Sequence, residues 1–182
     1  MQQVDAIIIG GGPCGLSAAI ELQNIGLNPI VIEKGNVVNS IYNYPTHQTF
    51  FSTSEKLAIG DVPFIIEERK PKRNQALVYY REVVKAKDVQ VNRFEMVHAV
   101  KKVEDRSIVE TSKATYETPY VVVATGYYDQ PNCSSAIYAP SITDCGALSP
   151  PIPSNAILII CFYTFRSVHF KFADKNKFII DS

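Results

Sequence analysis

A glycine-rich turn between an apolar run and a helical pattern is the feature that most constrains the fold of this 182-residue chain. The run Val4–Ile9 is mostly β-branched, which indicates a strand buried on both faces, as in a parallel sheet. It leads into Gly10-Gly11-Gly12-Pro13-Cys14-Gly15. Helical spacing then continues from Leu16 to about Ile25, and Gly26 is placed to cap that helix. A strand before the turn and a helix after it make the spacing Gly-x-Gly-x-x-Gly specific.

The three spaced glycines have separate geometric roles in a nucleotide site. Gly10 permits a tight turn, Gly12 lets the backbone approach a pyrophosphate, and Gly15 lets the helix pack closely on the strand. The helix that starts near Pro13 presents backbone N–H groups and a partial positive charge to the phosphates. The turn therefore predicts a dinucleotide-binding βα unit.

A second predicted strand, Pro29–Glu33, ends in an acid and completes a βαβ unit of about 30 residues. Glu33 falls 18 residues after Gly15, where a carboxylate accepts hydrogen bonds from a ribose diol. A carboxylate there repels a 2′-phosphate, so this site should not hold NADP. Lys34 is placed to cover the adenosine. The alternative is a glycine-rich turn in an α/β protein that binds no nucleotide, and the small Ala19 together with Glu33 argues against it.

The chain up to residue 132 continues with segments of consistent local pattern. Residues 35–65 are irregular and rich in aromatic side chains. A helix is predicted over Gln75–Lys87, with Asn74 as its N-cap. Short strand-forming segments follow, of which the middle two suggest an antiparallel β-meander: Val89–Phe94, Val97–Val103, Ser107–Thr111 and Tyr116–Val123.

Composition excludes several classes of partner. Basic and acidic residues both number 18, so the net charge is zero. Such a balance indicates no positive electrostatic field that would attract nucleic acid or an anionic membrane. No apolar run approaches the roughly 20 residues of a membrane helix, and no secretory signal pattern opens the chain. The four cysteines lack CxxC spacing, which disfavours a zinc site, so we expect no metal and a reducing, cytoplasmic location.

These patterns predict an α/β fold over residues 1–132, a Rossmann-like domain whose parallel sheet is flanked by helices and a β-meander. Residues 133–182 differ: they contain no glutamate, one of the nine glycines and three of the four cysteines. Their local pattern is inconsistent, which is evidence against a well-specified fold. We therefore expect a domain boundary near residue 132, followed by an aberrant tail.

Two motifs together carry a resemblance to a known family. The run that ends at Ala124-Thr125-Gly126 resembles the second fingerprint of flavoproteins with two dinucleotide-binding domains, although a buried strand with a turn glycine is the simpler alternative. With the segments Val4–Ala19, Ile41–Ser52 and Tyr120–Pro131, the chain resembles the bacillithiol-disulfide reductase (YpdA) family of Firmicutes over about residues 1–132. That family is related to thioredoxin reductases and flavin monooxygenases. The resemblance implies bound FAD, NADPH as reductant and a low-molecular-weight thiol disulfide as substrate.

The chain departs from this family after residue 132. The family continues with a second Rossmann domain for NADPH, and Ala156–Ile160 is a candidate for that domain's first strand. The following segment, Cys161–Phe165, has no glycine, so backbone bulk would block a pyrophosphate. We therefore expect an incomplete, truncated two-dinucleotide-binding flavoprotein without an NADPH site, whose tail comes from a frameshift, a rearrangement or a damaged gene.

Several further residues are candidates for roles at the cofactor. Cys14 lies at the helix N-terminus, where the dipole favours a thiolate that could attack a disulfide, and a small residue packed beside the pyrophosphate is the alternative. His47 is either a proton relay or an ordinary loop histidine. Tyr42 either walls the isoalloxazine or packs its own loop, as do Tyr44, Phe50 and Phe51. By resemblance, Val97 offers backbone contacts to the adenine, and Ala124, Thr125 and Gly126 pass the dinucleotide.

The sequence leaves three hypotheses of function open. The first is an FAD-dependent oxidoreductase that reduces disulfides. It would have no nucleic-acid or membrane partner, and it is compatible with a homo-oligomer. The second is a catalytically incomplete flavin-binding remnant, or a flavin monooxygenase-like protein. The third is a nucleotide-binding module unrelated to redox turnover, which the Thr-Gly motif disfavours.

Overall fold

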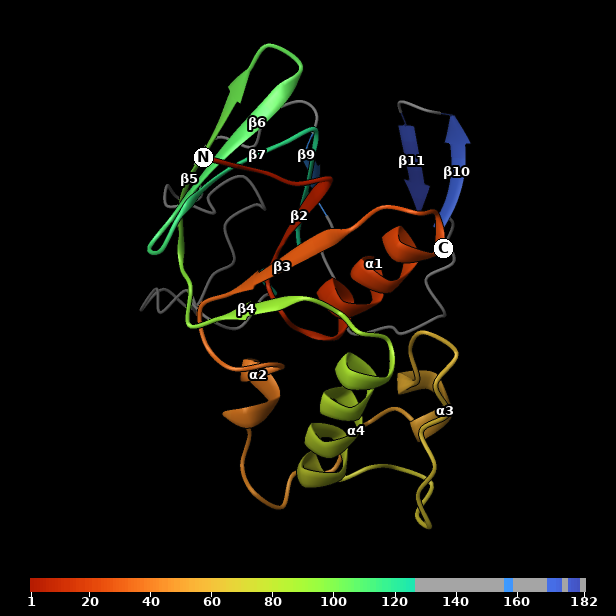
Figure 1. Cartoon of the computed structure of the whole chain (residues 1–182). Helices are drawn as coiled ribbons and strands as arrows, with labels where there is room; N and C mark the ends of the chain where they lie inside the picture. Colours follow the sequence, from red (N-terminus) through yellow and green to blue (C-terminus); the bar gives the residue numbers. More distant parts are fainter. Residues whose placement is uncertain (127–155, 159–169, 175–176, 181–182) are drawn as a thin grey trace, which may run out of the picture.

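The computed structural model describes residues 1–126, 156–158, 170–174 and 177–180, and the last three ranges are described by backbone alone. The main body has three layers: a parallel sheet in the middle, a small second sheet on one face, and helices on the other (Figure 1). The α/β Rossmann-like fold with a β-meander is confirmed. The predicted tail, 133–182, lies outside the described residues except for three short strands.

The parallel sheet has the strand order β4-β3-β2-β8-β9. β2 (Ala6–Ile9) lies at its centre and pairs in parallel with both β3 (Pro29–Glu33) and β8 (Tyr120–Val123). At one side β3 pairs with β4 (Val91–Arg93), and at the other β8 pairs with β9 (Ala156–Leu158). β9 falls within Ala156–Ile160, the candidate for the first strand of a second domain, and it pairs at the edge of this same sheet.

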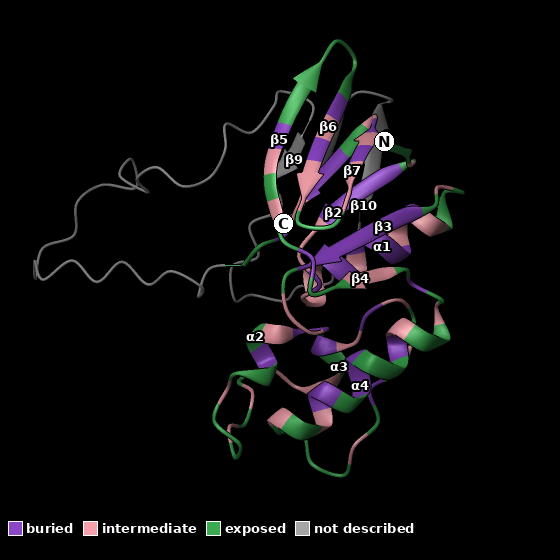
Figure 2. Cartoon of the chain, turned by 60° about the vertical axis from the view of Figure 1, so that its left-hand side comes forward, coloured by how far each residue is buried: buried purple, intermediate pink, exposed green. Residues whose placement is uncertain are grey.

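Successive residues of the central strands face opposite layers, as the two-residue period of a strand requires. On β2, Ile8 packs into the helix-side core with Leu16 and Val31. Its neighbour Ile7 faces the second sheet and packs with Val109 there. The exposed fraction of each of these side chains is 0%. Burial on both faces explains why these strands are continuous apolar runs (Figure 2).

Two longer helices cover one face of the parallel sheet or pack beside it. α1 (Pro13–Asn24) has Gly12 as its N-cap and Pro at N1, and Gly26 follows its C-cap with φ +86°. α4 (Arg73–Ala86) starts earlier than predicted, because Lys72 and not Asn74 is the N-cap. The Gln75 Oε1 atom accepts a hydrogen bond from the Lys72 N–H at 2.7 Å, which fixes that start. The irregular region contains two short helices, α2 (Asn39–Tyr42) and α3 (Ser54–Leu57).

The second sheet has the order β1-β7-β6-β5 and contains the predicted meander. β5 (Val97–Val103), β6 (Arg106–Thr111) and β7 (Thr115–Thr118) pair antiparallel in sequence, and β1 (Gln2–Gln3) pairs in parallel with β7. The single run predicted over Tyr116–Val123 is wrong, because Pro119 separates β7 from β8 and the two strands lie in different sheets. Elsewhere, β10 (Phe170–Asp174) and β11 (Lys177–Ile180) form an antiparallel pair. None of the helices in the described part is long and apolar enough to cross a bilayer.

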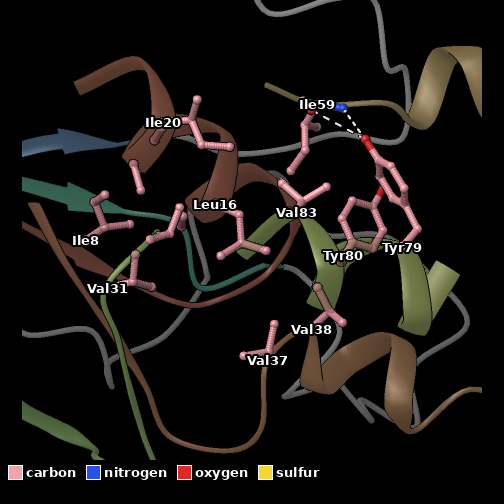
Figure 3. Close-up of a cluster of buried hydrophobic side chains, with 14 of the residues drawn as sticks. Ile8, Leu16, Ile20, Val31, Val37, Val38, Ile59, Tyr79, Tyr80 and Val83 are labelled. Carbon is pink, nitrogen blue, oxygen red and sulfur yellow. Dashed lines mark hydrogen bonds between the residues drawn. The ribbon is translucent and has the colours of Figure 1, made fainter. Parts of the chain in front are cut away.

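Two tyrosines of α4 hold the segment after α3 in place (Figure 3). The Tyr79 hydroxyl accepts a hydrogen bond from the Ile59 N–H at 2.8 Å and donates to the Val62 carbonyl at 2.7 Å. The Tyr79 ring stacks on Phe64 with centroids 4.1 Å apart. The Tyr80 hydroxyl donates to the Leu57 carbonyl at 3.1 Å, and its side chain is 0% exposed. Burial raises the pKa of Tyr79, so its hydroxyl is protonated and able to donate at neutral pH.

We expect Tyr79→Phe to lower the free energy of unfolding by about 1–3 kcal/mol, because it leaves the Ile59 N–H and the Val62 carbonyl without that partner. Urea unfolding followed by circular dichroism measures the change. Tyr120→Phe, at a ring that is 38% exposed, is the matched control and should change stability by less than about 0.5 kcal/mol. Equal stability of the Tyr79→Phe variant and the wild type would contradict the role of this hydroxyl.

Acid should weaken the start of α4 through Glu68. A hydrogen bond from Gln75 and then the contact with Lys72 lower the pKa of Glu68 from 4.5 to about 2. A carboxyl whose folded pKa is lowered stabilises the fold fully above its unfolded value, so this contribution is complete above pH 4.5 and is lost as the pH falls through about 2. The stability difference between wild type and Glu68→Gln should therefore shrink between pH 6 and pH 2. A difference for Glu68→Gln that stays constant from pH 6 to pH 2 would refute the assignment.

Candidate nucleotide site

The candidate site lies where the chain reverses direction across the parallel sheet. From β2 the chain passes through α1 to β3 on one side, whereas β8 pairs on the other side of β2. In open parallel sheets, ligands bind beyond the carboxyl ends of the strands at such a switch point. Gly10, Lys34 and Ala124 directly follow β2, β3 and β8. The three separately predicted motifs therefore lie at the carboxyl ends of neighbouring parallel strands.

The glycines of the turn are required by backbone contacts. A Cβ atom on Gly15 would lie 1.9 Å from the Gly10 carbonyl oxygen, and one on Gly10 would lie 2.4 Å from the Ala124 carbonyl oxygen. Gly10 also has φ +111°, which L side chains rarely adopt. Gly12 differs, because no atom lies within 4 Å of its Cβ position. The turn is therefore closed at Gly10 and Gly15 and open at Gly12, next to the N-terminus of α1.

Glu33 holds the glycine-rich turn through hydrogen bonds that no motif in the sequence predicts. Its carboxylate is 7% exposed, and its Oε2 atom accepts the Gly11 N–H at 2.6 Å. Its Oε1 atom accepts the Gly35 N–H at 2.7 Å. Each carboxylate oxygen has two lone pairs, so both retain capacity for the ribose hydroxyls predicted here. Glu33 thus joins the glycine-rich turn to the segment after β3.

Gly11 is held on its other side by Val38. The Val38 N–H donates to the Gly11 carbonyl at 2.9 Å, and Val38 is 0% exposed. Val38 has φ +49°, which is uncommon for a β-branched residue and persists only where the surroundings enforce it. The Glu33 carboxylate and the Val38 N–H, from two separate segments, therefore fix the turn, and neither Gly11 nor Val38 stands out in the sequence as a site residue.

The motif after β8 closes the site from the other side of β2. The Ala124 N–H donates to the Ile9 carbonyl at 2.8 Å and so continues the parallel pairing by one residue. Ala124 is buried against Gly10, whereas Thr125 and Gly126 are exposed, and Gly126 has φ +77°. A ligand contact from Thr125 or Gly126 stays a prediction.

Cys14 lies in the first turn of α1 and is half-buried. It is disulfide-bonded in the structure. The thiolate nucleophile hypothesis for Cys14 stays a prediction.

Tyr42 is the last residue of α2, and His47 lies between α2 and α3; both are exposed. Arg73 holds this segment: its guanidinium donates to the Tyr42 carbonyl from both Nε and Nη2, and it lies 5.3 Å from the centre of the Tyr42 ring. The Arg73 N–H also donates to the Gln48 carbonyl at 2.9 Å. Arg73 ends the charged run Glu67–Arg73, and a run of charges by itself indicates only a solvated loop. Roles for Tyr42, His47 and the exposed Lys34 at a ligand stay predictions.

Val97 is the first residue of β5, and the buried Glu95 precedes it closely. The Glu95 Oε1 atom accepts hydrogen bonds from the Tyr116 hydroxyl at 3.0 Å and from Thr111 Oγ1 at 2.5 Å. Burial first, then the hydrogen bond and charge of Glu95, raise the pKa of Tyr116. No motif marks Glu95 in the sequence. Its one signal is a glutamate in a strand-rich apolar region, which is too common to be specific.

Comparison with known proteins gives a family match over most of the chain. The model of the family described as pyridine nucleotide-disulphide oxidoreductase matches residues 7–143. Bacilliredoxin reductase Bdr of Bacillus subtilis is 70% identical over 133 residues, which make up 72% of this chain and 41% of that protein. The chain therefore spans about two fifths of the length of this relative.

Solved structures agree with this match. Bacillithiol disulfide reductase Bdr (YpdA) from Staphylococcus aureus superposes with a TM-score of 0.70 at 65% identity, over 71% of this chain and 40% of that one. A flavin-containing monooxygenase from Stenotrophomonas maltophilia superposes with a TM-score of 0.65 at 25% identity, over 69% of this chain and 39% of that one. The resemblance inferred from the glycine-rich and Thr-Gly motifs is confirmed.

Proposed function

Because the chain belongs to the pyridine nucleotide-disulphide oxidoreductase family, we propose that it is the FAD-binding part of a flavoprotein disulfide reductase. The observation that carries this proposal is the open position at Gly12 beside the N-terminus of α1. A pyrophosphate needs close backbone approach and N–H donors, and this geometry offers both. The 65% identity to solved bacillithiol disulfide reductases supports FAD over a lone NAD site.

The residues around the turn fit the two ends of a dinucleotide. Gly12 and the start of α1 would hold the pyrophosphate, and Glu33 would accept hydrogen bonds from the adenosine ribose. Val97 would contact the adenine through its backbone. Tyr42, His47 and Cys14 would lie toward the flavin ring, with Thr125 and Gly126 passing the dinucleotide. When bound, FAD supplies the redox chemistry by accepting a hydride and passing two electrons on, and the protein supplies position and electrostatics.

The reaction of the complete protein is NADPH plus a proton plus a disulfide giving NADP⁺ and two thiols. The substrate class we propose is a low-molecular-weight disulfide such as bacillithiol disulfide, which the solved relatives are described as reducing. The curated relative is instead described as reducing a bacilliredoxin. A reducing cytoplasm is the compartment in which this chemistry is useful. We further propose that this chain alone lacks the NADPH site.

The test is the absorption spectrum of the purified 182-residue chain after incubation with FAD and removal of unbound ligand. We expect a flavin spectrum with one FAD per chain, released by denaturation. NADPH added under nitrogen should leave the flavin absorbance unchanged, because the segment Cys161–Phe165 has no glycine that would admit a second pyrophosphate.

A colourless protein that takes up no FAD would overturn the proposal and favour the reading of a non-functional remnant. Bleaching of the flavin by NADPH would contradict the expected incompleteness. Oxygenation of an added substrate without disulfide reduction, measured in a full-length relative, would favour the monooxygenase alternative.

A further inference from the structure

The chain crosses from the parallel sheet to the meander through Phe94, Glu95 and Met96, between β4 and β5 (Figure 1). Phe94 has φ +55° and a side chain that is 64% exposed, so neither local preference nor burial fixes this crossing. Backbone bonds to the segment after β3 fix it instead. The Phe94 N–H donates to the Gly35 carbonyl at 3.1 Å, and the Glu95 N–H donates to the Glu33 carbonyl at 3.0 Å.

The Glu95 side chain points into the meander and is 2% exposed. Burying a carboxylate is costly unless hydrogen bonds satisfy it. Here two donors on different strands do so, Thr111 Oγ1 from β6 and the Tyr116 hydroxyl from β7. The Tyr116 hydroxyl also accepts a hydrogen bond from Asn92 Nδ2 at 3.0 Å, and Asn92 lies on β4. The raised pKa of Tyr116 keeps its hydroxyl protonated as a donor at neutral pH.

These bonds form one continuous path across the candidate site. It runs from the Gly11 N–H to the Glu33 carboxylate, and from the Glu33 carbonyl to the Glu95 N–H. It continues from the Glu95 carboxylate to Thr111 and Tyr116. Val97, the predicted adenine contact, follows Glu95 by two residues. The two predicted adenosine contacts, Glu33 and Val97, are thus linked through Glu95.

We propose that Glu95 is a positioning residue for the adenosine side of the cofactor site. Its carboxylate anchors the crossing to β6 and β7, and its backbone N–H bonds to the Glu33 carbonyl, so Glu95 fixes the start of β5 relative to the segment that carries Glu33. This inference rests on the proposed FAD site. A side chain that only filled space would fix no register between the sheets, whereas hydrogen bonds to two meander strands do. Glu95 touches no reacting group in this proposal and acts through Val97.

Affinity for FAD and for ADP, which carries the adenosine and pyrophosphate portion, is measured for four variants of the full chain. Glu95→Ala should weaken both affinities by at least about tenfold, and Tyr116→Phe by about threefold to tenfold, the range for one lost hydrogen bond. Glu95→Gln should stay within about twofold of wild type, because its amide oxygen still accepts both hydroxyls. The matched control is Tyr80→Phe, which removes a similarly buried hydroxyl from α4 and should leave both affinities unchanged.

Amide hydrogen exchange of the ligand-free chain is the second measurement. The Phe94 and Glu95 amides should exchange faster in Tyr116→Phe, whereas the Ile59 amide, held by Tyr79, should not change. Unchanged exchange at Phe94 and Glu95, or equal affinity losses in Tyr116→Phe and Tyr80→Phe, would overturn the inference while leaving FAD binding intact. A wild-type chain that binds ADP but not FAD would overturn the proposed function alone, and one that binds neither would overturn both.

Discussion

Replacing Gly15 by alanine should destabilise the domain by about 3 kcal/mol or more, because its new Cβ atom would lie 1.9 Å from the Gly10 carbonyl oxygen. The atoms that would have to move are backbone of the glycine-rich turn and α1, and no side chain can rotate to make room. Denaturant unfolding followed by circular dichroism measures the loss. We expect a variant that is largely unfolded or retains a much lower unfolding midpoint.

Gly12→Ala is the matched control in the same turn, and it should keep its stability but lose affinity for FAD. No atom lies within 4 Å of its Cβ position, and its φ of −77° suits alanine, so stability should change by less than about 1 kcal/mol. Its methyl group would fill the position proposed for the pyrophosphate, so affinity for FAD should fall by about a hundredfold or more. Wild-type stability in Gly15→Ala, or wild-type FAD affinity in Gly12→Ala, would contradict this division of roles.

The second large effect is expected at Glu33. Glu33→Gln keeps one acceptor oxygen and turns an NH₂ group toward the other backbone N–H, either that of Gly11 or that of Gly35. A buried donor is left unsatisfied, and the free energy of unfolding should fall by about 2–4 kcal/mol. Affinity for FAD should fall with it, because the same carboxylate is proposed to hold the ribose. Unfolding and FAD titrations on one preparation measure both effects.

The exposed Glu67→Gln is the control for removing a negative charge without disturbing the turn. It should match the wild type in stability to within about 0.5 kcal/mol and in FAD affinity. If Glu33→Gln were as stable as Glu67→Gln and lost only FAD affinity, Glu33 would be a ligand contact and not a structural clamp.

Much of the two sheets was predictable because the local pattern of their strands agrees with the structure. The predicted strand Pro29–Glu33 matches β3, and Val97–Val103 matches β5. The glycine-rich turn was specific because Gly10 and Gly15 each meet a separate steric demand of the backbone, whereas Gly12 leaves open the space that a pyrophosphate is proposed to fill. Burial along the whole of β3 and the contact of Gly15 with Gly10 inside one turn are features of this kind.

The errors come from contacts that local pattern does not encode. The apolar run around Pro119 has one uniform pattern, yet it supplies β7 to one sheet and β8 to the other. The N-cap of α4 is Lys72, because a glutamine side chain reaches back to its backbone. The hydrogen bonds of Glu33 to Gly11 and of Glu95 to Tyr116 join segments far apart in the chain. No single-sequence pattern reports such pairs.

The pairing of β2 with β8 sets an order on how the site is built. Ala6 faces Tyr120 and Gln2 faces Tyr116, so the first strands of the chain close against partners from the far end of the stretch 1–126. Such high contact order slows folding, because a long loop must close before these contacts form. On a growing polypeptide, the glycine-rich turn emerges early and has no backbone at Ala124 to pack against until nearly the whole domain has been synthesised. The ability to take up a cofactor should therefore arise late and in one cooperative step.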